Sequence, residues 1–256
     1  AIPVQTRDFD WTTSLNLAWQ KDRIDELANG KEDDIASGWY IGERLGVFAD
    51  YKVDGLWQDT EADRAEMAKW NANGYKFQPG MVKPVDQDGN YKMDGDDRVI
   101  LGHRRPSLTA GWSNTFTYKG IDLSFQMIGR FDYMIHTPEY LFGYGQMTER
   151  AMDFWTPDNT GAAYQKPIMT SVQTGNVDAF ASQLGYKKAS FIRMRNISVG
   201  YNFPRRLIEK ATLKSLKVYG QVINPFDLYQ SVKGIDLDTG LSYYNRSWVI
   251  GLEIGF

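Results

Sequence analysis

The feature that most constrains the fold is a set of segments in which apolar and polar side chains alternate. From Phe9 to Gln20 the odd positions are mostly apolar and the even positions mostly polar or small, and Leu108 to Tyr118 repeats the pattern. Alternation with a period of two is typical of β-strands that have one apolar and one polar face. The last such segment carries its apolar face at Trp248, Ile250, Leu252, Ile254 and Phe256.

Six full strands are predicted, and Ala1 to Thr6 reads as the end of another. The expected strands cover about residues 9–20, 108–118, 121–132, 190–203, 213–224 and 246–256. Strands of about 10 to 13 residues exceed the usual five or six and suit a tilted membrane crossing. No apolar run approaches the roughly 18 to 20 residues of a membrane helix.

The connections between these strands alternate strictly between short and long. The long ones span about residues 21–107, 133–189 and 225–245. Outer-membrane barrels have short periplasmic turns and long extracellular loops, so the alternation predicts this class and a periplasmic C-terminus. A partly strand-like stretch from Trp39 to Asp54 would break the alternation, and we therefore expect it inside the first long loop. In the same loop, Thr60 to Asp63 resembles a capping box that opens a short helix ending near Gly74.

Composition narrows the function classes. The chain has 15 Tyr, 13 Phe and 8 Trp, which fits the aromatic girdles of a barrel but also the aromatic core of a β-sandwich. It has no cysteine, which excludes thiol nucleophiles, zinc–thiolate sites and disulfides. The net charge of −3 gives no general attraction to nucleic acid.

The chain stops at Phe256, on the apolar face of its final strand. A terminal aromatic residue on an amphipathic last strand resembles the signal by which barrel proteins are recognised for insertion into the outer membrane. We favour that interpretation over an edge strand that happens to end in Phe, because an unpaired apolar edge invites aggregation and barrel closure removes it.

Several segments, in the order of the family, resemble TonB-dependent outer-membrane transporters of the SusC/RagA type. They are residues 7–12 (RDFDWT), 51–57 (YKVDGLW), the acidic loop from 86 to 102, 154–159 (FWTPDN), 191–204 (FIRMRNISVGYNFP) and the closing strand. The set covers nearly the whole chain and identifies it as a C-terminal portion of such a transporter.

The resemblance implies an all-β fold, the last strands of a 22-stranded transmembrane antiparallel barrel closed by an N-terminal plug. It implies import of oligosaccharides or peptides together with a SusD-like surface lipoprotein that acts as a lid, in the bacterial outer membrane. The implied partners are the N-terminal barrel and plug portion, the lipoprotein, the TonB complex through that N-terminal portion, and outer-membrane lipid.

One acidic loop has the spacing of an EF-hand calcium loop, with side-chain oxygens at positions 1, 3, 5, 9 and 12 and a carbonyl at position 7. Position 6 is Tyr91 where glycine is usual, and position 12 is Asp rather than Glu. The alternative is a solvated acidic turn. We favour a structural Ca²⁺ ion, because closely spaced carboxylates repel one another without a cation. The candidate ligands are Asp86, Asp88, Asn90, Lys92 (through its carbonyl), Asp94 and Asp97.

No catalytic constellation is found, and we expect a protein that is not an enzyme and has no organic cofactor. The two histidines, His103 and His136, have no metal-ligand spacing, and there is no nucleophile elbow or phosphate loop. Aromatic side chains in the long loops could stack on sugars or on a lid, although packing within the loops is the expected role of most. They are Trp39, Tyr40, Trp57, Trp70, Tyr140, Phe142 and Tyr144.

A second function stays open on these observations alone. A soluble extracellular β-rich module with a calcium loop, used for glycan binding or adhesion, would share the strands and the acidic loop. The two hypotheses differ in solubility: a barrel portion with a lipid-facing apolar stripe needs detergent, whereas a binding module does not.

Overall fold

The computed structural model describes residues 1–137, 153–167, 177–209, 212–240 and 245–256. The chain divides into two compact units. We call Ala1–Lys21, Pro106–Tyr133 and Lys188–Phe256 the sheet unit. We call Asp22–Arg105 and Met134–Lys187 the loop unit.

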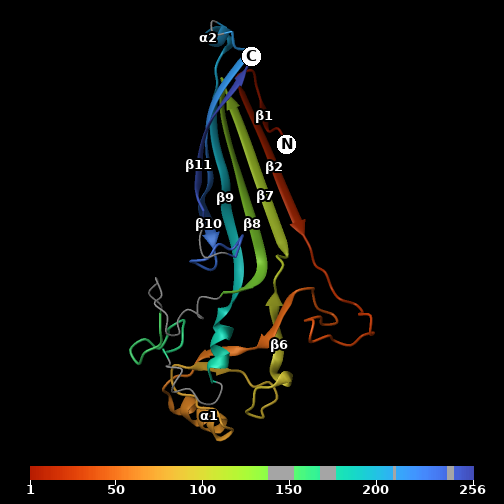
Figure 1. Ribbon diagram of the computed structural model, residues 1–256, viewed down its shortest axis with the longest axis vertical. Coiled ribbons are helices and arrows are strands. Elements are labelled where there is room, and N and C mark those ends of the chain that lie inside the picture. Colours follow the sequence, from red (N-terminus) through yellow and green to blue (C-terminus); the bar gives the residue numbers. More distant parts are fainter. Residues whose placement is uncertain (138–152, 168–176, 210–211, 241–244) are drawn as a thin grey trace. The chain divides into compact units, whose positions relative to one another are not determined.

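The sheet unit is built on one seven-stranded sheet whose neighbouring strands run antiparallel (Figure 1). Six long strands and one short one are present, as the alternation predicts. In spatial order they are β1 (Val4–Gln5), β2 (Phe9–Trp19), β7 (Leu108–Tyr118), β8 (Ile121–His136), β9 (Tyr186–Asn202), β10 (Ser215–Gln230) and β11 (Ser247–Gly255). The short helix α2 (Arg205–Ile208) lies in the link from β9 to β10.

Three strands run further than the alternation indicates. β8 continues past residue 132, β9 begins before residue 190, and β10 continues past residue 224. In β8 and β10 the reason is local irregularity: Asp132 and Asn224 have φ angles of 57° and 50°, and the β9–β10 register shifts beyond Ile223. A bulge inserts a residue and breaks the period of two, so the alternation ends there although the strand goes on.

The link between β7 and β8 fixes the register of that pair. Tyr118 faces Ile121, which leaves Lys119 and Gly120 as a two-residue turn with φ angles of 45° and 88°. Positive φ at both central residues is typical of the type I′ turn, whose twist matches that of the flanking strands.

Cross-strand pairing gathers the apolar side chains of β9, β10 and β11 on one face of the sheet. Ile197 faces Val222, which faces Trp248. One step along, Val199 faces Gly220 and then Ile250, and the next row is Tyr201, Val218 and Leu252. Because alternate residues share a face, these three rows make one continuous apolar surface.

The opposite face of the same sheet is polar. Lys217, between the apolar positions of β10, faces Asn202 on one side and Glu253 on the other. Its ammonium pairs with Asp122 of β8 at 3.0 Å, and the Asn202 amide donates to the same carboxylate at 2.7 Å. The sheet therefore has two chemically different faces.

The loop unit has secondary structure and a core of its own. Two strand pairs, β3 (Val47–Tyr51) with β6 (Arg98–His103) and β4 (Val53–Leu56) with β5 (Val82–Pro84), are separate from the large sheet. As expected, the strand-like stretch before residue 54 therefore adds no crossing to that sheet. Among the described residues of this unit, the helices are α1 (Glu61–Ala72) and the 3₁₀ turns η1 (Gly95–Asp97) and η4 (Val177–Gly185). The buried core comprises Leu56, Trp57, Met67, Trp70, Phe77, Met81, Val82, Trp155 and Phe180.

Helix α1 begins where the sequence predicts. Thr60 is its N-cap, and the Thr60 side chain accepts a hydrogen bond from the Asp63 amide. The Asp63 carboxylate pairs with Lys83 at 2.9 Å and accepts from the Gln58 amide, so it ties the first turn to the rest of the unit. Met67 and Trp70 are the face that α1 buries.

Replacing Thr60 by Ala should weaken the first turn of α1, because one helix N–H loses its acceptor. The expected loss is about 1 kcal/mol, or about fivefold faster amide exchange, as for other N-cap removals. Hydrogen-exchange mass spectrometry of the peptide that contains residues 58–66 measures it. Thr60→Ser keeps the cap and should exchange like the unaltered protein; equal effects of both substitutions would contradict this role.

Candidate functional site

The apolar face of the last strand is open to its surroundings. Trp248, Ile250 and Phe256 are 75%, 88% and 79% exposed. The other edge region of the sheet is similar, since Leu17 and Trp19 of β2 are also exposed. A continuous apolar surface of this kind marks contact with lipid or with another protein.

Three of the predicted calcium ligands come together in the loop unit. Ligand oxygens of Asp86, Asp88 and Asp97 all lie within 4.8 Å of one another. The Asp97 carboxylate is buried and accepts hydrogen bonds from the amides of Gln87 (2.8 Å) and Asp94 (3.0 Å). These bonds fix the two ends of the loop against each other.

The remaining candidates take other roles. The Asp94 side chain caps η1 and accepts from the Asp96 amide at 3.0 Å, so it lies outside the carboxylate group. Asn90 donates its side-chain N–H to Asp88 at 2.7 Å, and its side-chain oxygen accepts from the Lys92 amide. Tyr91 adopts a φ of 58°. It therefore makes the bend at which such loops usually have glycine.

The charges in this loop oppose one another. Burial raises the pKa of Asp86. The hydrogen bonds from the amides of Tyr91 and Gly89 lower this pKa by more, so the net shift is downward. The Asn90 amide lowers the pKa of the exposed Asp88, yet desolvation and the charges of Asp86 and Asp97 raise it overall. Asp88 is thus the carboxylate that a nearby cation would relieve most directly.

The loop aromatics separate into two groups. Trp57 and Trp70 are 0% and 2% exposed and belong to the core of the loop unit, which is the packing role expected for most. Trp39 is exposed and Tyr40 is partly buried. Tyr140, Phe142 and Tyr144 lie outside the described residues.

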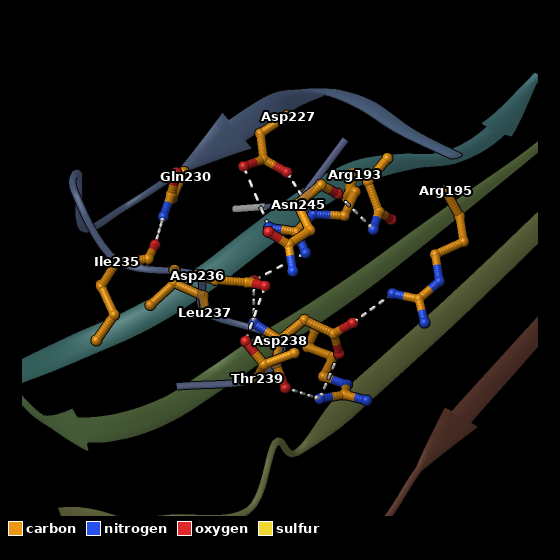
Figure 2. Close-up of polar contacts among 12 residues, drawn as sticks. Arg193, Arg195, Asp227, Gln230, Ile235, Asp236, Leu237, Asp238, Thr239 and Asn245 are labelled. Carbon is orange, nitrogen blue, oxygen red and sulfur yellow. Dashed lines mark hydrogen bonds and ion pairs between the residues drawn. The ribbon is translucent and has the colours of Figure 1, made fainter. Parts of the chain in front are cut away.

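A cluster of ion pairs that the sequence analysis did not identify holds the segment after β10 (Figure 2). Arg193 of β9 is 1% exposed and pairs with Asp227 at 2.6 Å and Asp236 at 2.8 Å. Asp238 pairs with both Arg130 (2.9 Å) and Arg195 (2.6 Å). Three arginines are thus balanced by three aspartates.

Two neutral contacts complete this attachment. The Tyr133 hydroxyl donates to the Leu237 carbonyl at 3.0 Å, and the Gln230 amide donates to the Ile235 carbonyl. The signal in the sequence is the matched spacing, Arg-x-Arg at 193–195 and Asp-x-Asp at 236–238. Arg193 and Arg195 share a side because they lie two apart in strand β9. The two aspartates lie at a turn, in which the Asp238 amide donates to the Asp236 carboxylate at 3.0 Å.

Neither histidine belongs to the group of possible metal ligands found among the described residues. The His103 Nδ1 atom lies 2.8 Å from the Arg105 carbonyl, and the His136 Nε2 atom lies 3.1 Å from the Ser182 carbonyl. Within the described residues, no helix is both long and apolar enough to span a membrane.

The chain is similar to known proteins of one kind. No family model matches the chain. TonB-dependent receptor P3 of Formosa agariphila is 26% identical over 285 residues, which cover 99% of this chain and 27% of the relative. TonB-dependent receptor SusC of Bacteroides thetaiotaomicron is 25% identical over 277 residues, covering 100% of this chain and 25% of SusC. The chain thus spans about a quarter of the length of these relatives.

The fold gives the same result. A structure of the RagAB peptide transporter aligns with a TM-score of 0.70 at 20% identity, covering 100% of this chain and 28% of the matched chain. The chain is thus similar over its whole length to proteins named TonB-dependent receptors, and it shares its fold with part of a peptide transporter. The predicted resemblance to a C-terminal portion of a SusC/RagA-type transporter is confirmed.

Asp236→Asn should weaken the attachment of the segment after β10 to β9. The expected cost is about 1.5–3 kcal/mol, as for a lost hydrogen bond to a charged group, because Arg193 keeps Asp227 as its partner. The measurement is hydrogen exchange of residues 231–240. Asp8→Asn removes an exposed carboxylate of the same unit and should change nothing there.

The same attachment should also depend on acid. Burial raises the pKa of Asp236. Hydrogen bonds from the Asp238 amide, Thr239 and Arg193 lower it by more, so the pKa lies below its ordinary value of 3.8. A lowered pKa means stabilisation that is complete above the unfolded pKa and lost as the pH falls through the folded pKa. Protection of residues 231–240 should therefore be constant near neutral pH and fall only below about pH 4.

Proposed function

We propose that this chain forms the C-terminal strands of a plugged, 22-stranded β-barrel, the importer of a bacterial outer membrane. In this proposal the apolar rows on β9, β10 and β11 face lipid, and the polar face with Lys217 and Asp122 faces the barrel interior. The two-faced sheet is the observation that carries the proposal. Similarity to TonB-dependent receptors over the whole chain supports it.

The complete transporter would take up oligosaccharides or peptides under a SusD-like lipoprotein lid, with energy from the TonB complex. The RagAB peptide transporter, whose structure aligns with this chain, supports import. The loop unit would lie outside the cell and the C-terminus in the periplasm, because the turn at Lys119–Gly120 is short and the links that form the loop unit are long. Phe256 would complete the insertion signal with Trp248, Ile250, Leu252 and Ile254.

Two neighbouring residues of β11 test this proposal, because they lie on opposite faces. Ile250→Arg places a charge toward lipid and should cost about 2–4 kcal/mol of barrel stability. Val249 pairs with Gln221 on the polar face, so Val249→Arg should cost far less. The measurement is the amount of complete transporter recovered from native outer membranes in mild detergent, with mass spectrometry of what co-purifies.

The expected result is a barrel-and-plug polypeptide and a surface lipoprotein recovered with the unaltered chain and with Val249→Arg, and a strong loss for Ile250→Arg. Equal behaviour of the two variants would contradict the assignment of the faces. Recovery of the chain alone in the soluble fraction would favour the calcium-containing binding module instead.

We also propose that the acidic loop holds a structural Ca²⁺ ion between Asp86, Asp88 and Asp97. The close approach of three carboxylates and the raised pKa of Asp88 support it. Asn90 and the Lys92 carbonyl remain candidate ligands, and Asp94 would stay with η1. The ion would order the loop against Tyr91, whose ring contacts Trp70 with centroids 5.8 Å apart.

Terbium luminescence measures this site, since Trp70 and Tyr91 can transfer excitation to a lanthanide bound beside them. The purified transporter should show Tb³⁺ emission that Ca²⁺ competes away. Asp88→Asn should abolish it, because one of the three carboxylates is lost. Asp96→Asn, an exposed acid outside the group, is the matched control and should keep it. Emission that Ca²⁺ does not displace would contradict the proposal.

A further inference from the structure

The charges of the ion-pair cluster after β10 are unevenly distributed. Arg193 is buried and pairs with two aspartates. Arg130 and Arg195, by contrast, share the single carboxylate of Asp238, and 39% and 42% of their side-chain surface stays exposed. The Asp238 side chain itself is only 8% exposed. The accessible part of the cluster is therefore made of two positive charges that share one largely buried negative charge.

Much of the hydrogen-bonding capacity of the two exposed arginines is unused. Each contacts the Asp238 carboxylate through its Nη1 atom, at 2.9 Å for Arg130 and 2.6 Å for Arg195 (Figure 2). Within the described part of the chain, neither residue donates a hydrogen bond from its Nε or Nη2 atom. A guanidinium group carries five N–H donors, so both residues can bind a further oxyanion while they keep their bonds to Asp238.

The register of β7 and β8 fixes the face of the sheet on which Arg130 lies. Arg130 is opposite Thr109, and eight residues earlier Asp122 is opposite Thr117, with no register shift between the two pairs. Because alternate residues of a strand share a face, Arg130 lies on the side of Asp122. That side is the polar face of the sheet.

Arg195 lies on the same side, because it binds the same Asp238 carboxylate as Arg130. It is two residues from Ile197 of the apolar rows, but the β9–β10 register shifts directly after the pair that Asn196 forms. Side chains stop alternating regularly where a bulge interrupts the pairing, so the apolar rows end before Arg195. Both arginines therefore belong to the polar face.

We infer that Arg130 and Arg195 bind an oxyanion of the transported substrate, above all a carboxylate, inside the barrel. Guanidinium groups bind carboxylates through two parallel hydrogen bonds with high geometric specificity. The inference rests on the proposed function, because it requires the polar face to line the barrel interior. It adds a substrate class, namely molecules that carry an acidic group.

The charge balance of the cluster favours a passing substrate over a fixed carboxylate from the rest of the transporter. Three arginines are already matched by three aspartates, so the folded cluster needs no further negative charge. The unused N–H donors still attract an oxyanion, but weakly. A transport path needs a contact of this strength, favourable enough to admit the substrate and weak enough to release it.

Chemical modification of arginine in the purified complete transporter tests this. Phenylglyoxal reacts with accessible guanidinium groups, and mass spectrometry measures the rate at each residue. Succinate serves as the oxyanion probe, and sodium chloride of the same ionic strength controls for screening. We expect succinate to slow the modification of Arg130 and Arg195 several-fold and to leave that of Arg205, an exposed residue of α2, unchanged.

Arg195→Lys separates binding from a structural role. Lysine keeps the charge that pairs with Asp238 but loses the planar set of donors of a guanidinium group. In this variant succinate should protect Arg130 several-fold less, while hydrogen exchange of residues 231–240 stays as in the unaltered protein. Unchanged protection of Arg130 would overturn the inference and leave Arg195 a structural role only.

Three other results would each overturn the inference. They are no protection by succinate, equal protection by sodium chloride, and arginines that do not react at all because the remainder of the transporter covers them. Cysteine reporters in native outer membranes separate such a failure from failure of the proposed function. A hydrophilic maleimide should label Gln126→Cys, on the polar face, and not Met127→Cys, on the apolar face. If this labelling is found without protection by succinate, only the oxyanion site is wrong. The reverse labelling means that the assignment of the faces is wrong as well.

Discussion

The register between neighbouring strands is the constraint on which the rest of the sheet unit depends. Because side chains alternate with a period of two, a slip of one residue in one pair would move that strand's apolar row to the polar face. The rows through Val199, Gly220 and Ile250 exist only in the observed register. The type I′ turn at Lys119–Gly120 fixes the pairing of β7 and β8 in the same way. The separation of the two faces, and with it the proposed division between lipid and interior, follows from these local choices.

Much of this arrangement could be predicted from the sequence, because a sheet with one apolar and one polar face requires apolar and polar residues to alternate along each strand. The prediction was incomplete at Asp132 and Asn224, where positive φ angles interrupt the alternation without ending the strand. For the acidic loop, spacing identified Asp86, Asp88 and Asp97, which do converge. It could not show that Asp94 would cap η1, because a carboxylate near a helix start has two competing uses.

The Arg193 cluster shows a different limit of sequence reasoning. The sign of a side chain's charge does not tell which residue it pairs with. From the sequence, the aspartates at 236 and 238 could equally have been exposed to solvent. In the structure the two aspartates pair with Arg193 and Arg195. Charge-assisted hydrogen bonds offset the free energy that it costs to remove these charges from water. The segment is thereby attached to the sheet by ion pairs as well as by the buried side chains of Ile235 and Leu237. The loop unit uses the other solution, in which Trp57, Trp70 and their neighbours exclude water.

The shared core of the loop unit also has a consequence for the order of folding. Trp155 donates its indole N–H to Gln58 at 3.0 Å and packs in the same core as Trp57 and Trp70, although 97 residues separate the bonded pair. Contacts so distant in sequence carry a large loop-closure cost and form late. During synthesis, the first long link must therefore wait, with its core incomplete, until β7, β8 and the second link as far as Phe180 have emerged. The loop unit can thus be completed only after the β7–β8 hairpin, which separates its two stretches in the sequence, has been made.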